Sequence, residues 1–170
     1  RYLRELGGVI LDADILAREI VQPGEPAWKD IIERFGTEVI RDDGQIDRAR
    51  LAQKVFADPK SLETLNLITH PRVAQKTKEL LEEIRARDPE AMVVVDAPLL
   101  IEAGMVPLVD EVWLLALDTE TQLNRLMQRD AVDKEQAMRR VTSQMPLQEK
   151  RRYARRIIDN QGSPEETRAQ

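Results

Sequence analysis

Hydrophobic residues in this chain gather into short continuous runs, and the segments between the runs have helical spacing. Three runs stand out, at Val9–Leu11, Met92–Val95 and Val112–Leu117. Each run is continuous rather than alternating, which is typical of strands that are covered on both faces in a parallel sheet. Parallel strands that are joined by helical segments define an α/β fold, and the sequence therefore predicts one.

The segments between and after these runs predict a series of helices and one inserted lobe. The expected helices are Arg1–Leu6, Ile15–Val21, Pro26–Phe35, a helix capped by Asp47 that extends to Val55, Leu62–Ile68, Val73–Arg87, Thr119–Gln128, Lys134–Gln144, Leu147–Arg156 and a last one that begins near Ser163. A turn is expected at 159–162. The block from about residue 20 to 89 is too long for a loop, so we interpret it as a helical subdomain inserted between two strands.

Composition limits the classes of function. The 170 residues suit one compact domain with a small lobe, and a hydrophobic content of 42% is enough for a core. The absence of cysteine removes disulfides and thiol chemistry. No apolar run approaches the roughly 18 residues of a membrane span, and no secretory leader is visible. We therefore expect a cytoplasmic protein that does not engage a membrane.

Charge is distributed unevenly along the chain. The net charge is −5, yet residues 118–159 carry ten basic and seven acidic side chains. An acidic body with one basic segment suits an anionic small ligand better than a long polyanion, which usually meets a wholly basic face. Aromatic residues make up only 4%, which argues against a platform for stacking bases. We therefore expect no nucleic-acid partner.

Carboxylates follow two of the predicted strands. Asp12 and Asp14 come directly after the first apolar run, and Asp96 closes the second. Ligands bind at the carboxyl ends of strands in open parallel sheets, where a carboxylate can orient Mg²⁺ or accept a proton from a hydroxyl. Each can instead cap the following helix or turn. For Asp12 and Asp96 these two interpretations stay open, whereas for Asp14 we favour a role in chemistry.

The basic segment holds a second candidate. Arg125 and Arg129 are four residues apart, so they share one face of a helix and can clamp phosphate oxygens. The alternative is a solvated helix, which is the interpretation that we prefer for the other arginine pairs. The one histidine, His70, lies in Thr69-His70-Pro71. Without a second histidine, a Ser-His-Asp triad or a multi-histidine metal site is not expected.

Together, these segments resemble the dephospho-CoA kinases in order and spacing across nearly the whole chain. The matching segments are Val9–Asp14, Ala17-Arg18, Val21–Gly24, Val55–Pro59, Ile68–Pro71, Asp96–Glu102, Gln122–Asp130, Gln144–Pro146 and Ile158–Gly162. Each segment alone is modest, but the ordered set is specific.

The resemblance implies a fold of the P-loop NTPase class, similar to nucleotide kinases, with a five-stranded parallel core sheet. It implies a nucleotide-binding core at 1–19, 90–118 and 151–170, a helical substrate-binding domain at 20–89 and a small lid at 119–150. The implied activity is the ATP-dependent phosphorylation of the ribose 3′-hydroxyl of dephospho-CoA, the last step of coenzyme A biosynthesis. We therefore expect dephospho-CoA, ATP and Mg²⁺ as partners, and a monomer or weak homo-oligomer.

The same resemblance implies roles for individual residues. Asp14 matches the proposed base on the 3′-hydroxyl, and Arg125 matches the lid arginine that meets the transferred phosphate. The residues that would lie near dephospho-CoA are Asp12, Arg18, His70 and Leu99. Those that would bind the nucleotide are Arg129, Asn160 and Gly162. Asp96 is the expected metal ligand.

The resemblance has one departure. The family's G-x-x-x-x-G-K-[ST] loop, whose backbone N–H groups wrap phosphates, does not occur in these 170 residues. We expect the parent protein to carry it, because a chain without it should be nearly inactive. Two other hypotheses remain: a loop-less protein that binds dephospho-CoA without turning over ATP, and another small-molecule kinase of the same fold. The long helical insertion after Asp14 and the Thr69-His70-Pro71 segment argue against the second.

Overall fold

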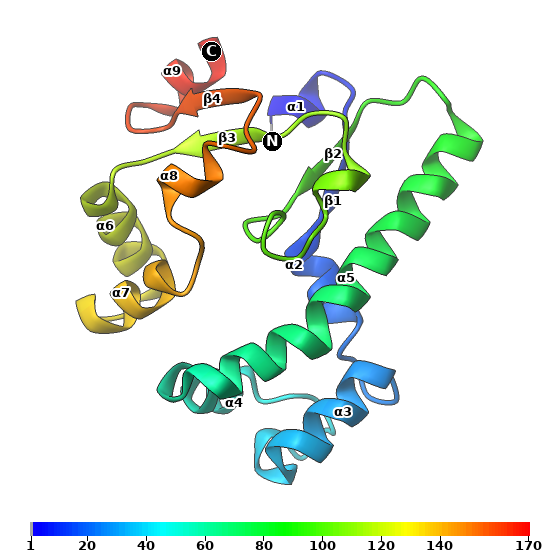
Figure 1. The fold of residues 1–170 in the computed structure, drawn as a ribbon, viewed down its shortest axis with the longest axis vertical. Helices are drawn as coiled ribbons and strands as arrows, with labels where there is room; N and C mark the ends of the chain where they lie inside the picture. Colours follow the sequence, from blue (N-terminus) through cyan, green and yellow to red (C-terminus); the bar gives the residue numbers. More distant parts are fainter. Residues whose placement is uncertain (1) are drawn as a thin grey trace. The chain divides into compact units, whose positions relative to one another are not determined.

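The computed structural model describes residues 2–170 (Figure 1), which form two compact units divided after Gly104. The first unit contains α1 (Tyr2–Glu5), β1 (Val9–Asp12), α2 (Ala13–Glu19), α3 (Pro26–Phe35), η1 (Thr37–Val39), α4 (Arg48–Ala57), α5 (Pro59–Arg87) and β2 (Val93–Asp96). The second contains η2 (Val106–Leu108), β3 (Trp113–Ala116), α6 (Thr119–Asp130), α7 (Lys134–Thr142), α8 (Leu147–Lys150), β4 (Arg156–Asp159) and α9 (Pro164–Ala169).

Each unit holds one pair of parallel strands. In the first unit β1 pairs with β2, with Val9 opposite Val93 and Asp12 opposite Asp96. In the second unit β3 pairs with β4, with Trp113 opposite Arg156. The three predicted strands are therefore confirmed within one residue at each end, and so is the α/β class with parallel pairing.

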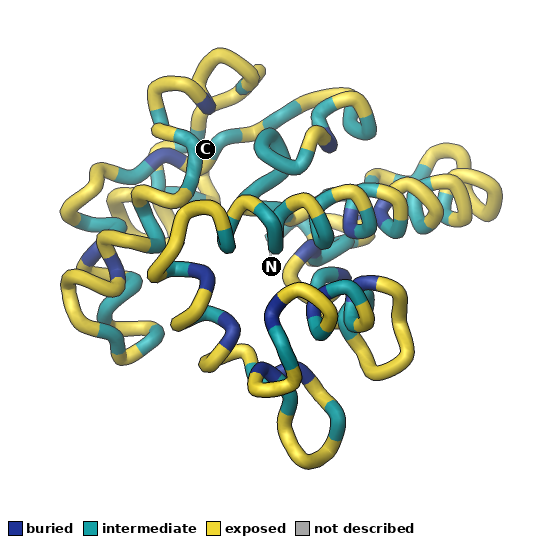
Figure 2. The backbone as a smooth tube through the Cα atoms, turned by 60° about the horizontal axis from the view of Figure 1, so that its bottom comes forward, coloured by how far each residue is buried: buried dark blue, intermediate teal, exposed yellow. Residues whose placement is uncertain are grey.

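The helical block of the first unit has its own core. Ile31 and Phe35 of α3 pack with Leu51 and Val55 of α4, and partly buried residues of α5 cover them. The buried segments in Figure 2 are short and separated by exposed backbone. The indole of Trp28 donates to the Gly44 carbonyl at 2.9 Å, which ties α3 to the loop before α4. Helices with a common apolar core support the interpretation of this block as a subdomain.

Helix α5 corrects one prediction. We expected two helices separated at Thr69-His70-Pro71, but a single helix runs from Pro59 to Arg87 with Pro71 inside it. Proline removes one hydrogen bond of the helix without forcing the chain to stop. Arg72 strengthens this turn, since its guanidinium donates to the Ile68 carbonyl at 2.6 Å and pairs with Asp30 of α3.

Strand β4 corrects another prediction. We expected a helix from Leu147 to Arg156, but α8 ends at Lys150 and Arg156–Asp159 form a strand. The basic run before it has good helix propensity, which outweighed the signal of the β-branched pair Ile157-Ile158. Pairing with β3 decides the conformation, and it begins at Arg155, whose N–H donates to the Val112 carbonyl at 2.9 Å.

The strands are less covered than their apolar sequences predict. Trp113 and Leu115 of β3 are 45% and 55% exposed, because β3 pairs with β4 alone. The four strands of the described residues make two two-stranded sheets, not the five-stranded sheet that the resemblance implies. No helix in the described part of the chain is long and apolar enough to cross a membrane.

Candidate functional site

The carboxyl ends of β1 and β2 bring two aspartates together. Asp12 and Asp96 are register partners, so they lie side by side at one edge of the sheet. Asp12 also caps α2, because its Oδ1 accepts from the backbone N–H groups of Asp14 at 2.9 Å and Ile15 at 3.1 Å. The capping interpretation of Asp12 is therefore confirmed, and its second carboxylate oxygen remains on the side of Asp96.

Helix α2 presents a carboxylate and an arginine beyond this edge. Asp14 lies in its first turn and Arg18 in its last. They are four residues apart and share a face of the helix. Both are exposed, and neither side chain has a hydrogen bond or ion pair within residues 2–170. Unpaired charges on one face are available to a ligand.

Arg48, the first residue of α4, joins this cluster. Burial lowers the pKa of the Arg48 guanidinium, the positive charge of Arg18 adds to the effect, and Asp14 opposes it. An arginine stays charged at neutral pH in any case, so the shift matters here because it shows that the three charges are close. Two arginines that face each other with no ion pair within residues 2–170 favour binding of an anion.

His70 of α5 contacts the loop after β2. Burial lowers the pKa of His70, while the charge of Glu102 and a hydrogen bond with the Glu102 backbone raise it by less. The same loop carries Leu99, whose carbonyl accepts from the Ala103 N–H at 2.8 Å in a tight turn. His70 therefore belongs with the loop of Leu99, as the sequence predicts for residues near one ligand.

Arg125 and Arg129 of α6 have different partners. Arg125 donates to the backbone carbonyls of Asn160, Gln161 and Gly162 at 2.8, 3.0 and 3.3 Å. Arg129 forms a two-bond pair with Asp130 at 2.7 and 3.1 Å. Asp130 also accepts from Arg140, and the hydrogen bond from Arg129 is the largest cause of its lowered pKa. The two arginines thus share a helix but no common partner.

The segment after β4 contains Asn160 and Gly162. The Asn160 N–H donates to the Ala116 carbonyl at 2.9 Å, and the Asn160 side-chain oxygen accepts from the Thr167 hydroxyl at 3.0 Å. The carboxylate of Glu166 covers the open side of Gly162, where a Cβ atom would clash with it. These contacts hold residues 160–162 in one defined conformation.

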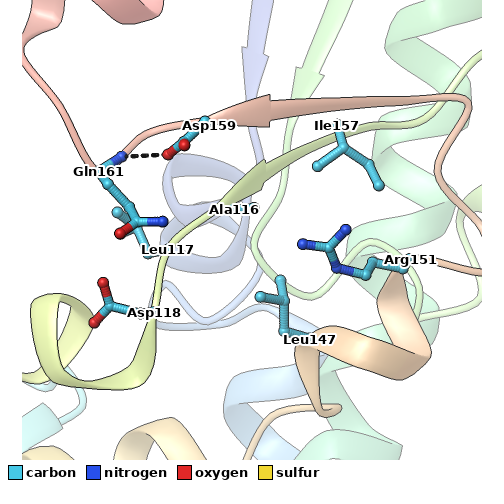
Figure 3. A pocket seen from close by; sticks show the side chains of 8 residues that line it. All are labelled: Ala116, Leu117, Asp118, Leu147, Arg151, Ile157, Asp159 and Gln161. Atoms are coloured by element: carbon cyan, nitrogen blue, oxygen red, sulfur yellow. Dashed lines mark hydrogen bonds between the residues drawn. The ribbon is translucent and has the colours of Figure 1, made fainter.

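A pocket opens at the carboxyl ends of β3 and β4 (Figure 3). It has a volume of about 240 Å³. Its lining residues are Ala116, Leu117, Asp118, Leu147, Arg151, Ile157, Asp159 and Gln161. Apolar side chains from β4 and α8 form its body, and Asp118, Arg151 and Gln161 supply polar groups at its edge. A pocket smaller than the roughly 300 Å³ of drug-sized sites suits a planar fragment such as a nucleobase.

The residues also fit a magnesium ion. No group of three or more His, Cys, Asp or Glu side chains in residues 2–170 is placed to hold a metal. In kinase sites Mg²⁺ is bound by one or two carboxylates plus the phosphates of the substrate. The neighbouring oxygens of Asp12 and Asp96 are the right donors for that arrangement.

Two structural features escaped the sequence reasoning. Arg48 was read only as part of a helix that Asp47 caps, although its place at the start of α4 exposes its charge. The hydroxyl of Thr167 was not considered, yet it anchors Asn160. A charged residue directly after a helix cap was the available signal for Arg48, whereas nothing in the sequence pairs Thr167 with Asn160.

Two solved structures share this arrangement of strands, insertion and helices. A crystal structure of a Thermus thermophilus protein is similar with a TM-score of 0.73 and 33% identity, over 98% of this chain and 83% of that one. The dephospho-CoA kinase of Campylobacter jejuni is similar with a TM-score of 0.66 and 29% identity, over 98% and 82%. The fold is that of the P-loop kinases, which transfer phosphoryl groups.

Relatives narrow this class to a family. The sequence model of the dephospho-CoA kinases matches residues 1–166. The dephospho-CoA kinase of Carboxydothermus hydrogenoformans is 45% identical over all 170 residues and 82% of its own length. That of Geobacter metallireducens is 46% identical over all 170 residues and 84% of its length. The chain belongs to the dephospho-CoA kinase family, and its enzyme class is that of the phosphotransferases.

Proposed function

We propose that the protein transfers the γ-phosphoryl group of ATP to the ribose 3′-hydroxyl of dephospho-CoA, with Asp14 as the base. The proposal is supported by the free carboxylate of Asp14, one residue into the helix that follows β1. In the reaction the 3′-oxygen bonds to the γ-phosphorus, the bond from that phosphorus to the β-phosphate oxygen breaks, and ADP leaves. The hydroxyl proton passes to Asp14.

The arginines near Asp14 suit the rest of the substrate. Arg18 lies one helical turn from Asp14, which is about 5.4 Å along the axis, and Arg48 is close to both. Dephospho-CoA carries a 5′-diphosphate a few bonds from its 3′-hydroxyl on the same ribose. We assign this diphosphate to Arg18 and Arg48, with His70 and Leu99 along the remainder of the substrate.

The second unit supplies the nucleotide side of the reaction. The pocket beside Asn160 and Gly162 suits the adenine of ATP, while Arg125 and Arg129 are the basic groups for its phosphates. Mg²⁺ would be held by Asp96 and Asp12 and would neutralise phosphate charge. The protein would work in the cytoplasm as a monomer or weak homo-oligomer, on small molecules rather than nucleic acid.

Calorimetric titration of the 170-residue chain with dephospho-CoA tests the substrate assignment. We expect Arg48→Gln and Arg18→Gln each to weaken binding roughly tenfold, by analogy with other charge-assisted contacts to phosphate. Arg87→Gln is the matched control, since Arg87 pairs with Glu83 near the end of α5. If the unaltered chain does not bind dephospho-CoA, the proposed function fails. If it binds and Arg48→Gln matches the control, only the diphosphate assignment fails.

A further inference from the structure

One guanidinium holds three consecutive carbonyl groups in the second unit. Nη1 of Arg125 donates to the Asn160 carbonyl, and Nη2 donates to those of Gln161 and Gly162. Arg125 lies in the third turn of α6, some 35 residues away along the chain. Three of its five N–H donors are therefore used by one short loop.

The partners of Arg125 are unusual for an exposed arginine. Most exposed arginines of this chain that form ion pairs do so with carboxylates, as Arg139 does with Glu135. Arg125 meets only neutral backbone oxygens among its hydrogen-bond partners in residues 2–170. A planar fork with fixed donor directions holds several acceptors at once, which a lysine cannot do in the same geometry. The arrangement therefore constrains the loop rather than neutralising a charge.

The same loop is held from other sides as well. Asn160 is bound to Ala116 through its N–H and to Thr167 of α9 through its side chain. The Gln161 N–H donates to Asp159 Oδ1 at 2.9 Å, the bond drawn in Figure 3. Arg125 adds the only hydrogen bonds from α6 to these three carbonyls among the described residues. It thus joins α6 to a loop that β3 and α9 already anchor.

The loop and the pocket share residues. Asp159 and Gln161 line the pocket, and Asp118, which caps α6, lines its other side. The distance between these two sides depends on the contact between α6 and the loop. Arg125 makes that contact, so its guanidinium sets the width of the pocket.

We propose that Arg125 is a positioning residue for the nucleotide base, acting through its hold on the carbonyls of residues 160–162. The proposal rests on the proposed function, in that it takes the pocket to receive the purine of ATP. It differs from a phosphate contact in what it changes: a loosened loop weakens binding and selection of the base, whereas a lost phosphate contact lowers the rate of transfer.

Three variants separate these roles. Arg125→Lys keeps the charge but loses the fork. Thr167→Val removes the hydroxyl that anchors Asn160 from the opposite side, and so loosens the same loop without touching Arg125. Arg139→Gln removes a positive charge from α7, where Arg139 pairs with Glu135, and serves as the control. Amide exchange over residues 156–163 is measured without nucleotide, and ATP and GTP kinetics follow in the protein that contains this chain.

We expect Arg125→Lys and Thr167→Val to speed exchange in the loop and to raise KM for ATP roughly tenfold, with kcat changed by less than about threefold. Preference for ATP over GTP should fall in both, and Arg139→Gln should match the unaltered protein. Unchanged exchange in Arg125→Lys, or a loss confined to kcat, would overturn the proposal. If the protein does not phosphorylate dephospho-CoA, the proposed function fails, while the exchange data and calorimetry with ATP still decide the role of Arg125.

Discussion

Replacement of Asp12 separates its two roles, because capping and charge depend on different properties of the side chain. Oδ1 accepts two backbone N–H groups at 2.9 and 3.1 Å. Alanine loses both bonds, which we expect to cost about 1 kcal/mol of unfolding free energy, the usual value for a lost cap. Asparagine caps as well as aspartate. It also removes repulsion from Asp96, which lies about 4.8 Å away across the strands.

The charge itself adds little to stability. Two carboxylates about 5 Å apart repel by less than about 1 kcal/mol in water, so Asp12→Asn should be as stable as the parent or slightly more. Urea unfolding followed by Trp28 fluorescence, in a Trp113→Phe background, reports on the first unit. We expect Asp12→Ala to lower Tm by about 3 °C.

Activity should follow the charge instead. If Asp12 joins Asp96 in holding Mg²⁺, Asp12→Asn should lose at least roughly a hundredfold in kcat, a loss typical of removed groups that act on the transition state. Two results refute this reasoning. Asp12→Ala as stable as the parent would mean that the cap contributes nothing, and Asp12→Asn with full activity would mean that Asp12 is only a cap.

Two further predictions concern stability. Burial lowers the pKa of His70, so the folded protein resists protonation there; stability should fall as pH decreases below about 6.5 toward the lowered pKa, because the unfolded chain takes up the proton first. His70→Gln should flatten this part of a urea-unfolding series, and an unchanged slope would contradict the assignment. Ala131, which ends α6, has φ 51° and ψ 42°; Ala131→Gly should raise unfolding free energy by about 0.5 kcal/mol, since glycine adopts this conformation without strain. A lower Tm in calorimetry would show that chain entropy outweighs that relief.

Elements with strong local signals were predictable from the sequence. The strand at β1 and the helix from Pro26 to Phe35 follow from continuous or periodic apolar residues, and the start of α4 follows from the capping side chain of Asp47. The parallel α/β class follows from the same patterns. The family follows from ordered segments that no single motif could establish.

The remainder depends on contacts distant in sequence. Helix α5 continues through Pro71 because packing on α3 and α4 outweighs one missing hydrogen bond. Strand β4 forms because β3 offers an edge, which local propensity does not register. The hold of Arg125 on residues 160–162 joins segments that the sequence treats separately, and the cluster of Arg18 with Arg48 arises in the same way.

The most direct measurement is the rate of coenzyme A formation from ATP and dephospho-CoA by the protein that contains this chain, with and without Asp14→Asn. Glu19→Gln is the matched control, since Glu19 is an exposed carboxylate on the same helix. We predict that Asp14→Asn lowers kcat roughly 10²–10⁴-fold, as expected for a lost general base, with dephospho-CoA binding nearly unchanged, while Glu19→Gln has full activity. Formation of coenzyme A at an undiminished rate by Asp14→Asn would contradict the role of Asp14, and no formation by the unaltered protein would contradict the proposed function.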